Sequence, residues 1–200
     1  MTAARPTLRS LLSLPDTPAS LARSALILID CQNTYREGIM QLEGVEPALE
    51  QCAKLLQRAR DAGAPVIHIQ HDAGPGTPYD VRAPIGAIAD IVAPSAGETI
   101  IVKAYPSSFE QTNLDAELKK RGVTDLVIAG FMTHVCVNST ARAAFNHGYR
   151  ATVVGNATAT RALANPVGGT VSAEAMHNGA LTALSDIFAI VVPSEGNIPA

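Results

Sequence analysis

The chain has 200 residues, of which 47% are hydrophobic and 16% charged; this composition fits a single globular domain and excludes intrinsic disorder. Its 15 basic and 18 acidic residues give a net charge of −3, and no basic run marks a nucleic-acid binding surface. No apolar stretch approaches the ~18 residues that a membrane-spanning helix needs, so we expect neither nucleic acid nor a membrane as a partner.

The N-terminal residues differ in character from the rest of the chain. We assign residues 1–24 to an N-terminal extension and residues 25–200 to the folded domain. The apolar run Leu11-Leu12-Ser13-Leu14 in the extension is shorter than the roughly 7–15 apolar residues of a secretory signal. Three widely spaced cysteines indicate free thiols in a reducing compartment. We therefore expect a cytoplasmic protein.

Strands and helices alternate along the domain, and the strands are unbroken apolar runs. This pattern predicts a parallel sheet that helices bury on both faces, a single-domain three-layer α/β/α architecture. We expect strands at 25–29, 65–70, 99–102, 126–129, 151–154 and 187–192; helices at 45–59, 135–147 and 171–184; and a short helix with Leu114 and Leu118 on one face that stops at Gly122.

Residues 71–98 fit this alternation poorly. The segment is rich in glycine and proline and reads as a long excursion from the sheet. A loop of that length in a compact domain is often a wall of a functional site or an oligomer contact.

Three reactive side chains follow predicted strands: Asp30, Lys103 and Cys136. Ligands of open parallel sheets bind beyond the carboxyl ends of the strands, where these residues would meet. Taken singly, they could be a helix cap, a solvated lysine and a core cysteine. Together they favour a nucleophilic site, in which a helix N-terminus and Lys103 lower the pKa of the Cys136 thiol and Asp30 carries the proton. We expect Cys31 and Cys52 to be packed structural residues.

Three stretches of the sequence resemble the isochorismatase-like cysteine hydrolases. They are Leu28 to Asn33 (LIDCQN), Glu98 to Phe109 (ETIIVKAYPSSF) and, the most specific, Gly130 to Ala144 (GFMTHVCVNSTARAA). Their order and spacing agree with the family from about residue 25 to 192. Asn156-Ala157 departs from the Asp-Ala of many members, a change that keeps the side-chain shape and loses the charge.

The resemblance implies a catalytic triad of Cys136, Asp30 and Lys103 and a sheet in the strand order 3-2-1-4-5-6. It also implies an oxyanion hole from the backbone N–H groups of Met132 and Cys136, with a cis peptide bond between Phe131 and Met132. With this triad retained, the resemblance implies hydrolysis of an amide, ureide or carbamoyl C–N bond through a thioester. The resemblance further implies a homo-oligomer, a dimer or tetramer.

Other activities stay open at this point. Isochorismatase-type members lack the cysteine, and nicotinamidase-type members add a metal near the end of the second strand. Here His68 and His71 would face opposite sides of a strand, so we expect neither a metal nor another cofactor. A catalytically silent family member is a further alternative. A nucleotide-binding module is disfavoured because no glycine-rich fingerprint follows Asp30.

The substrate is expected to be a small molecule, held by residues near the predicted strand ends. The candidate substrate-binding residues are Gln32, Tyr35, His71, Tyr105, Phe131 and His134.

Overall fold

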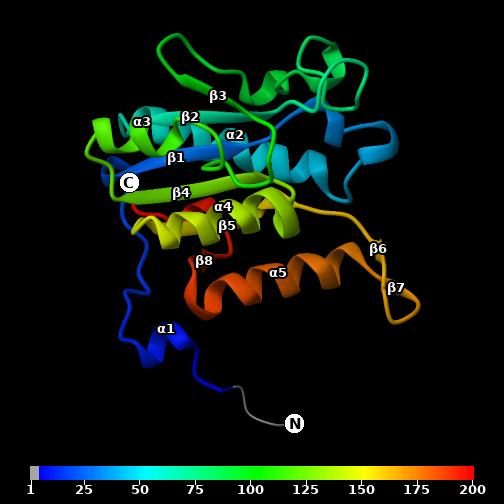
Figure 1. The fold of residues 1–200 in the computed structure, drawn as a ribbon. Helices are drawn as coiled ribbons and strands as arrows, with labels where there is room; N and C mark the ends of the chain where they lie inside the picture. Colours follow the sequence, from blue (N-terminus) through cyan, green and yellow to red (C-terminus); the bar gives the residue numbers. More distant parts are fainter. Residues whose placement is uncertain (1–4) are drawn as a thin grey trace.

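The computed structural model describes residues 5–200 and is built around a six-stranded parallel sheet (Figure 1). The strand order is β3-β2-β1-β4-β5-β8, which confirms the predicted topology. The strands are β1 (Ser24–Ile29), β2 (Val66–His71), β3 (Thr99–Lys103), β4 (Asp125–Phe131), β5 (Arg150–Ala159) and β8 (Ile190–Val192).

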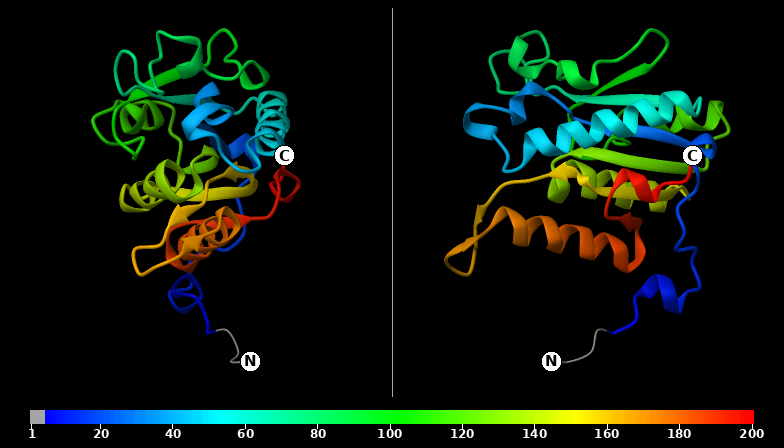
Figure 2. Two further views of the ribbon diagram at one scale, coloured as in Figure 1. Left: turned by 90° about the vertical axis from the view of Figure 1, so that its right-hand side faces the viewer. Right: turned by 180° about the vertical axis from the view of Figure 1, so that it is seen from behind.

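Helices cover both faces of the sheet, as Figure 2 shows from the side. Helix α2 (Val45–Asp61) packs on one face, and α3 (Leu114–Lys120), α4 (Asn138–Asn146) and α5 (Ala173–Ile187) pack on the other. In β1, Leu26 and Leu28 belong to the α2 core, whereas Ile27 and Ile29 belong to the core under α3, α4 and α5. Both faces of β1 are therefore buried, which is why its sequence is continuously apolar.

The predicted C-terminal elements needed two corrections. The last strand begins at Ile190 rather than at residue 187, because α5 continues through Ile187. A small antiparallel hairpin of β6 (Leu163–Ala164) and β7 (Thr170–Val171) also precedes α5. Strands of two residues are too short to show a period in the sequence, so they could not be predicted.

The excursion that follows β2 is fastened to the sheet beside the carboxyl ends of the strands. The side-chain amides of Gln32 and Gln70 both donate to the Gly86 carbonyl, at 2.7 and 2.8 Å. A Cβ atom at position 86 would lie 2.2 Å from the Asp80 carbonyl oxygen, so only glycine fits there. The segment therefore forms a wall over this edge of the sheet.

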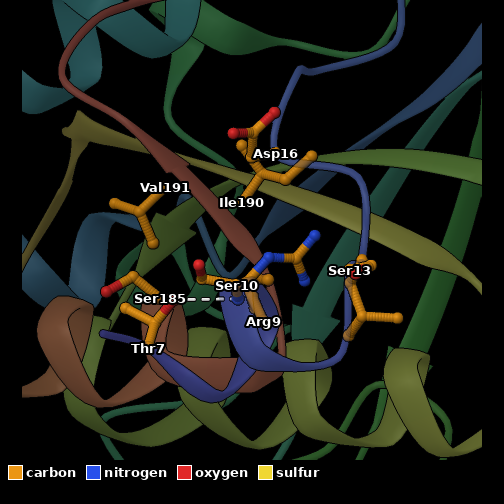
Figure 3. Close-up of a pocket in the computed structure, with 10 residues that line it drawn as sticks. Thr7, Arg9, Ser10, Ser13, Asp16, Ser185, Ile190 and Val191 are labelled. Carbon is orange, nitrogen blue, oxygen red and sulfur yellow. Dashed lines mark hydrogen bonds between the residues drawn. The ribbon is translucent and has the colours of Figure 1, made fainter. Parts of the chain in front are cut away.

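The N-terminal segment with α1 (Leu8–Leu11) lies against the far end of α5. The Leu8 N–H donates to the Asp186 carboxylate at 2.9 Å, and Arg9 donates to the Ile187 carbonyl at 3.0 Å. A cavity of about 440 Å³ lies between this segment and β8, with Arg9 and Ser185 in its wall (Figure 3). None of the predicted catalytic residues borders this cavity. In residues 5–200, no helix is long and apolar enough to cross a membrane.

Glu98 fastens the other end of the excursion to the α2 face. Its carboxylate accepts two hydrogen bonds from Arg60 of α2, at 2.7 and 2.9 Å, and one from the Ser95 N–H. His68 of β2 contacts the same carboxylate at 2.9 Å. Arg60 is the largest cause that lowers the pKa of Glu98 to about 2. His68 is thus a structural residue on the face opposite His71.

Glu98→Ala should destabilise the fold by about 3 kcal/mol, because Arg60 and His68 would lose a mostly buried anion. Since the pKa of Glu98 falls from 4.5 to about 2 on folding, its contribution is complete above pH 4.5 and is lost as the pH falls towards 2. Urea unfolding at pH 7 and pH 3 measures both effects. Glu46→Gln, in an exposed pair with Arg36, is the matched control and should cost less than about 1 kcal/mol. An equal loss of unfolding free energy in both variants would contradict the role of Glu98 as a structural anchor.

Candidate active site

Asp30, Lys103 and Cys136 meet at the carboxyl edge of the sheet. Asp30 directly follows β1, Lys103 ends β3, and Cys136 lies in the turn after β4. The Lys103 Nζ atom lies 2.8 Å from Asp30 Oδ2 and 3.4 Å from Cys136 Sγ. Both side chains of the ion pair have 0% exposure. Lys103 therefore bridges the carboxylate and the thiol in an enclosed site.

An unusual backbone conformation turns Asp30 towards its partners. Strict alternation in β1 would place Asp30 on the α2 face with Leu28, away from Lys103. Asp30 instead has φ +49°, and Cys31 behind it packs in the α2 core. Beside it, Gly130 has φ +107°, and a Cβ there would lie 2.0 Å from the Ile29 carbonyl oxygen. The two strand ends can approach this closely because position 130 has no side chain.

Cys136 lies in a π-helical turn, Thr133–Val137, that leads into α4. The N–H groups of Val135 and Val137 both donate to the Met132 carbonyl, at 3.1 and 3.2 Å. The peptide bond between Phe131 and Met132 is cis. The predicted helix over 135–147 thus has a separate first turn, and this turn presents the sulfur to Lys103.

The surroundings of Cys136 raise the pKa of its thiol, contrary to the sequence-based expectation of a lowered pKa. Burial, followed by the negative charge of Asp30, raises the pKa of Cys136 to about 12, and Lys103 only partly opposes this. Burial also raises the pKa of Asp30, against the lowering effect of Lys103. The prediction was wrong because it counted the lysine and the helix end but neither desolvation nor the carboxylate.

Two of the expected substrate-binding residues, Tyr35 and Phe131, form an aromatic cluster. Their rings meet edge to face at a centroid distance of 5.7 Å, and both residues are fully buried. Tyr79 joins them through Tyr35, at 5.9 Å, and also packs on the His71 ring at 4.9 Å. Sequence analysis missed Tyr79 because it lies in the irregular 71–98 segment, where no pattern indicates which side chains turn inward.

Gln32, an expected substrate-binding residue, is hydrogen-bonded to backbone groups at the strand end. Its amide nitrogen donates to the carbonyls of His71 and Gly86, and its amide oxygen accepts from the His71 N–H at 2.8 Å. The side chain is buried and its amide is hydrogen-bonded to the backbone, so Gln32 holds the strand end in place. Contact with a substrate stays a prediction.

Tyr105 and His134 are the two remaining candidate substrate-binding residues outside the aromatic cluster. Tyr105 is 43% exposed and borders a cavity of about 240 Å³ whose wall also includes Asp72, Lys103 and Gln111. The half-buried His134 is hydrogen-bonded to Thr160, and burial lowers its pKa. Whether either residue contacts a substrate stays a prediction.

The described residues contain no group of three or more metal-ligating side chains that could hold an ion. His71 instead places its Nδ1 atom 3.3 Å from Lys103 Nζ. Burial, followed by the charge of Lys103, lowers the pKa of His71 to about 4, so the ring is neutral at pH 7.

Comparison with known proteins identifies the family. The sequence matches the isochorismatase domain over residues 24–196. The chain belongs to the isochorismatase family. It is 33% identical to the secreted isochorismatase effector Isc1 of Verticillium dahliae, over 94% of this chain and 96% of that protein. A crystal structure of an isochorismatase from Pseudomonas putida superimposes with a TM-score of 0.93 at 35% identity, covering 98% of this chain and 100% of that one.

Relatives within the isochorismatase family include enzymes that hydrolyse C–N bonds. The chain is 35% identical to maleamate amidohydrolase of Pseudomonas putida, over 66% of this chain and 70% of that protein. These similarities confirm the family and the fold that the sequence motifs indicated.

Alkylation of Cys136 by iodoacetamide should be slow at pH 7 and rise about tenfold per pH unit up to pH 10, because only the thiolate reacts. Lys103→Met should react more slowly at every pH, since the cation that favours the thiolate is removed. Peptide mapping after alkylation measures the rate at this cysteine. A rate that is already at its plateau at pH 7 would contradict a raised pKa of the Cys136 thiol.

Proposed function

We propose that this protein is a cysteine hydrolase that cleaves a C–N bond of a small amide, ureide or carbamoyl compound. The observation that carries the proposal is the enclosed cluster in which Lys103 contacts both Asp30 and Cys136. An amidohydrolase among the relatives supports the reaction class.

In the first half of the reaction, the Cys136 sulfur attacks the carbonyl carbon of the substrate while its proton passes to Asp30. A raised thiol pKa makes this transfer concerted with attack, because a free thiolate is scarce. The backbone N–H groups of Met132 and Cys136 are the expected donors to the oxyanion. The C–N bond then breaks, and Asp30 returns the proton to the departing nitrogen.

In the second half, water attacks the thioester and gives a proton to Asp30. The C–S bond breaks, the acid leaves, and the proton returns to the Cys136 sulfur. Lys103 contacts both groups and keeps the carboxylate and the sulfur at fixed places throughout. This cycle uses only groups of the chain and one water.

Arg161 suggests what else the substrate carries. Its Nε atom is buried and has no hydrogen-bond partner among residues 5–200. The Arg161 charge is close enough to Tyr79 and His134 to affect the pKa of both groups, which places it near the aromatic cluster. A buried guanidinium donor without a partner is costly and fits a carboxylate bidentately. We therefore include a carboxylate near the scissile bond in the proposal.

Cys136→Ala and Asp30→Asn should each reduce ammonia release from the best substrate by about 10³-fold or more, because one lacks the nucleophile and the other the proton carrier. A panel of small amides, ureides and carbamoyl acids supplies the substrate. Cys52→Ala is the control and should keep its activity. Full ammonia release by Cys136→Ala would overturn the thioester mechanism.

Arg161→Met should raise KM at least tenfold for substrates that carry a carboxylate, because the methionine side chain reaches only to the position of Nε and has no donors. Uncharged amides of the same size should be affected less than threefold, roughly the spread expected of a neutral change. Steady-state kinetics on matched acid and amide pairs measure the difference. Equal losses on both members of a pair would remove Arg161 from substrate recognition.

A further inference from the structure

The Lys103 ammonium has three acceptors around it. An ammonium carries three N–H donors and no acceptor. Asp30 Oδ2, His71 Nδ1 and Cys136 Sγ lie 2.8, 3.3 and 3.4 Å from Nζ. The family triad accounts for two of these contacts. His71 accounts for the third and has no role in the mechanism above.

We propose that His71 is a positioning residue that holds the Lys103 ammonium between Asp30 and Cys136 through the lone pair on Nδ1. The proposal rests on the proposed function and replaces our expectation that His71 binds the substrate. His71 touches neither the sulfur nor the carboxylate in the contacts above, so it acts through Lys103.

The neutral imidazole suits this role. If Nδ1 accepts from Lys103, the ring proton lies on Nε2. Burial and Lys103 hold the pKa of His71 at about 4, while Asp72 opposes them. The groups that face the ring are Lys103 on β3, Asp72 after β2 and Tyr79 in the excursion. A protonated ring would turn a donor towards the ammonium, so the neutral form is the one that can hold it.

Register and packing fix the place of His71. It pairs with Lys103 across the parallel β2 and β3 strands, so the two side chains leave the sheet on the same face. Gln32 brackets the His71 backbone with bonds to both its N–H and its carbonyl. The Tyr79 ring packs edge to face on the His71 ring, with the ring centroids 4.9 Å apart. The acceptor is therefore set by the sheet before any substrate arrives.

Lys103 needs such an acceptor because its side chain is long and flexible. A lysine side chain carries about 2 kcal/mol of rotamer entropy, and its ammonium is a point charge without a preferred direction. With only Asp30 to bind, the ammonium could turn wholly to the carboxylate and leave the sulfur. His71 opposes this turn.

His71→Asn and His71→Leu test the proposal as a matched pair. The asparagine Oδ1 occupies nearly the place of Nδ1 and can accept from Lys103, whereas leucine cannot. His71→Leu should lower kcat about 10–100-fold with KM unchanged and slow the alkylation of Cys136 by iodoacetamide at pH 8 about tenfold. His71→Asn should stay within about threefold of the wild type in both measurements. If His71→Leu does not fold, His71→Gln replaces it, because its acceptor lies at the position of Nε2.

Three results would overturn the proposal. They are unchanged alkylation and kcat in His71→Leu, an equal loss in His71→Asn and His71→Leu, and a rise in KM with kcat unchanged, which would mark a substrate ligand. The alkylation assay needs no substrate. If the wild type releases no ammonia from any compound while the alkylation rates keep their order, the proposed function fails and the role of His71 stands.

Discussion

The buried ion pair between Asp30 and Lys103 is the constraint on which the site depends. Two opposite charges without exposure to water depend on good mutual geometry to stay ionised. This holds all the more here because Asp30 Oδ1 has no hydrogen-bond partner among residues 5–200. The left-handed backbone at Asp30, the close approach of Gly130 to β1 and the pairing of β2 with β3 all serve this geometry. The arrangement of the sheet edge follows from the need to keep one ammonium in place.

The two faces of the sheet have different roles in the structure. The α2 face holds the core around Leu49 and Cys52 and the structural cluster of Glu98. The opposite face carries Lys103 and Cys136 where the strands end. His68 and His71 are three positions apart on β2 and lie on opposite faces. His68 contacts Glu98, and His71 contacts Lys103. A strand that is buried on both sides can thus supply stability and chemistry from neighbouring positions.

Sequence reasoning could place Asp30, Lys103 and Cys136 together because the carboxyl ends of parallel strands converge, whatever the details of the loops. It could not predict the positive φ of Asp30, because this conformation depends on neighbouring strands rather than on residue type. Tyr79 and Arg161 were missed for a related reason, since they come from irregular segments without a period. The raised pKa of the Cys136 thiol depends on burial, which a sequence motif does not report.

The segment between β2 and β3 is fastened along its length. The Gly86 carbonyl and the Glu98 carboxylate are two of its anchors, and the Thr34 hydroxyl adds others by donating to the carbonyls of Pro78 and Ile85. Tyr79, which does pack beside the site, lies on the part of the segment before Gly86. The ring beside the site therefore follows directly after an anchored residue, Pro78. An insertion in this segment would have to keep the contacts of Thr34, Gly86 and Glu98 to leave Tyr79 in its place.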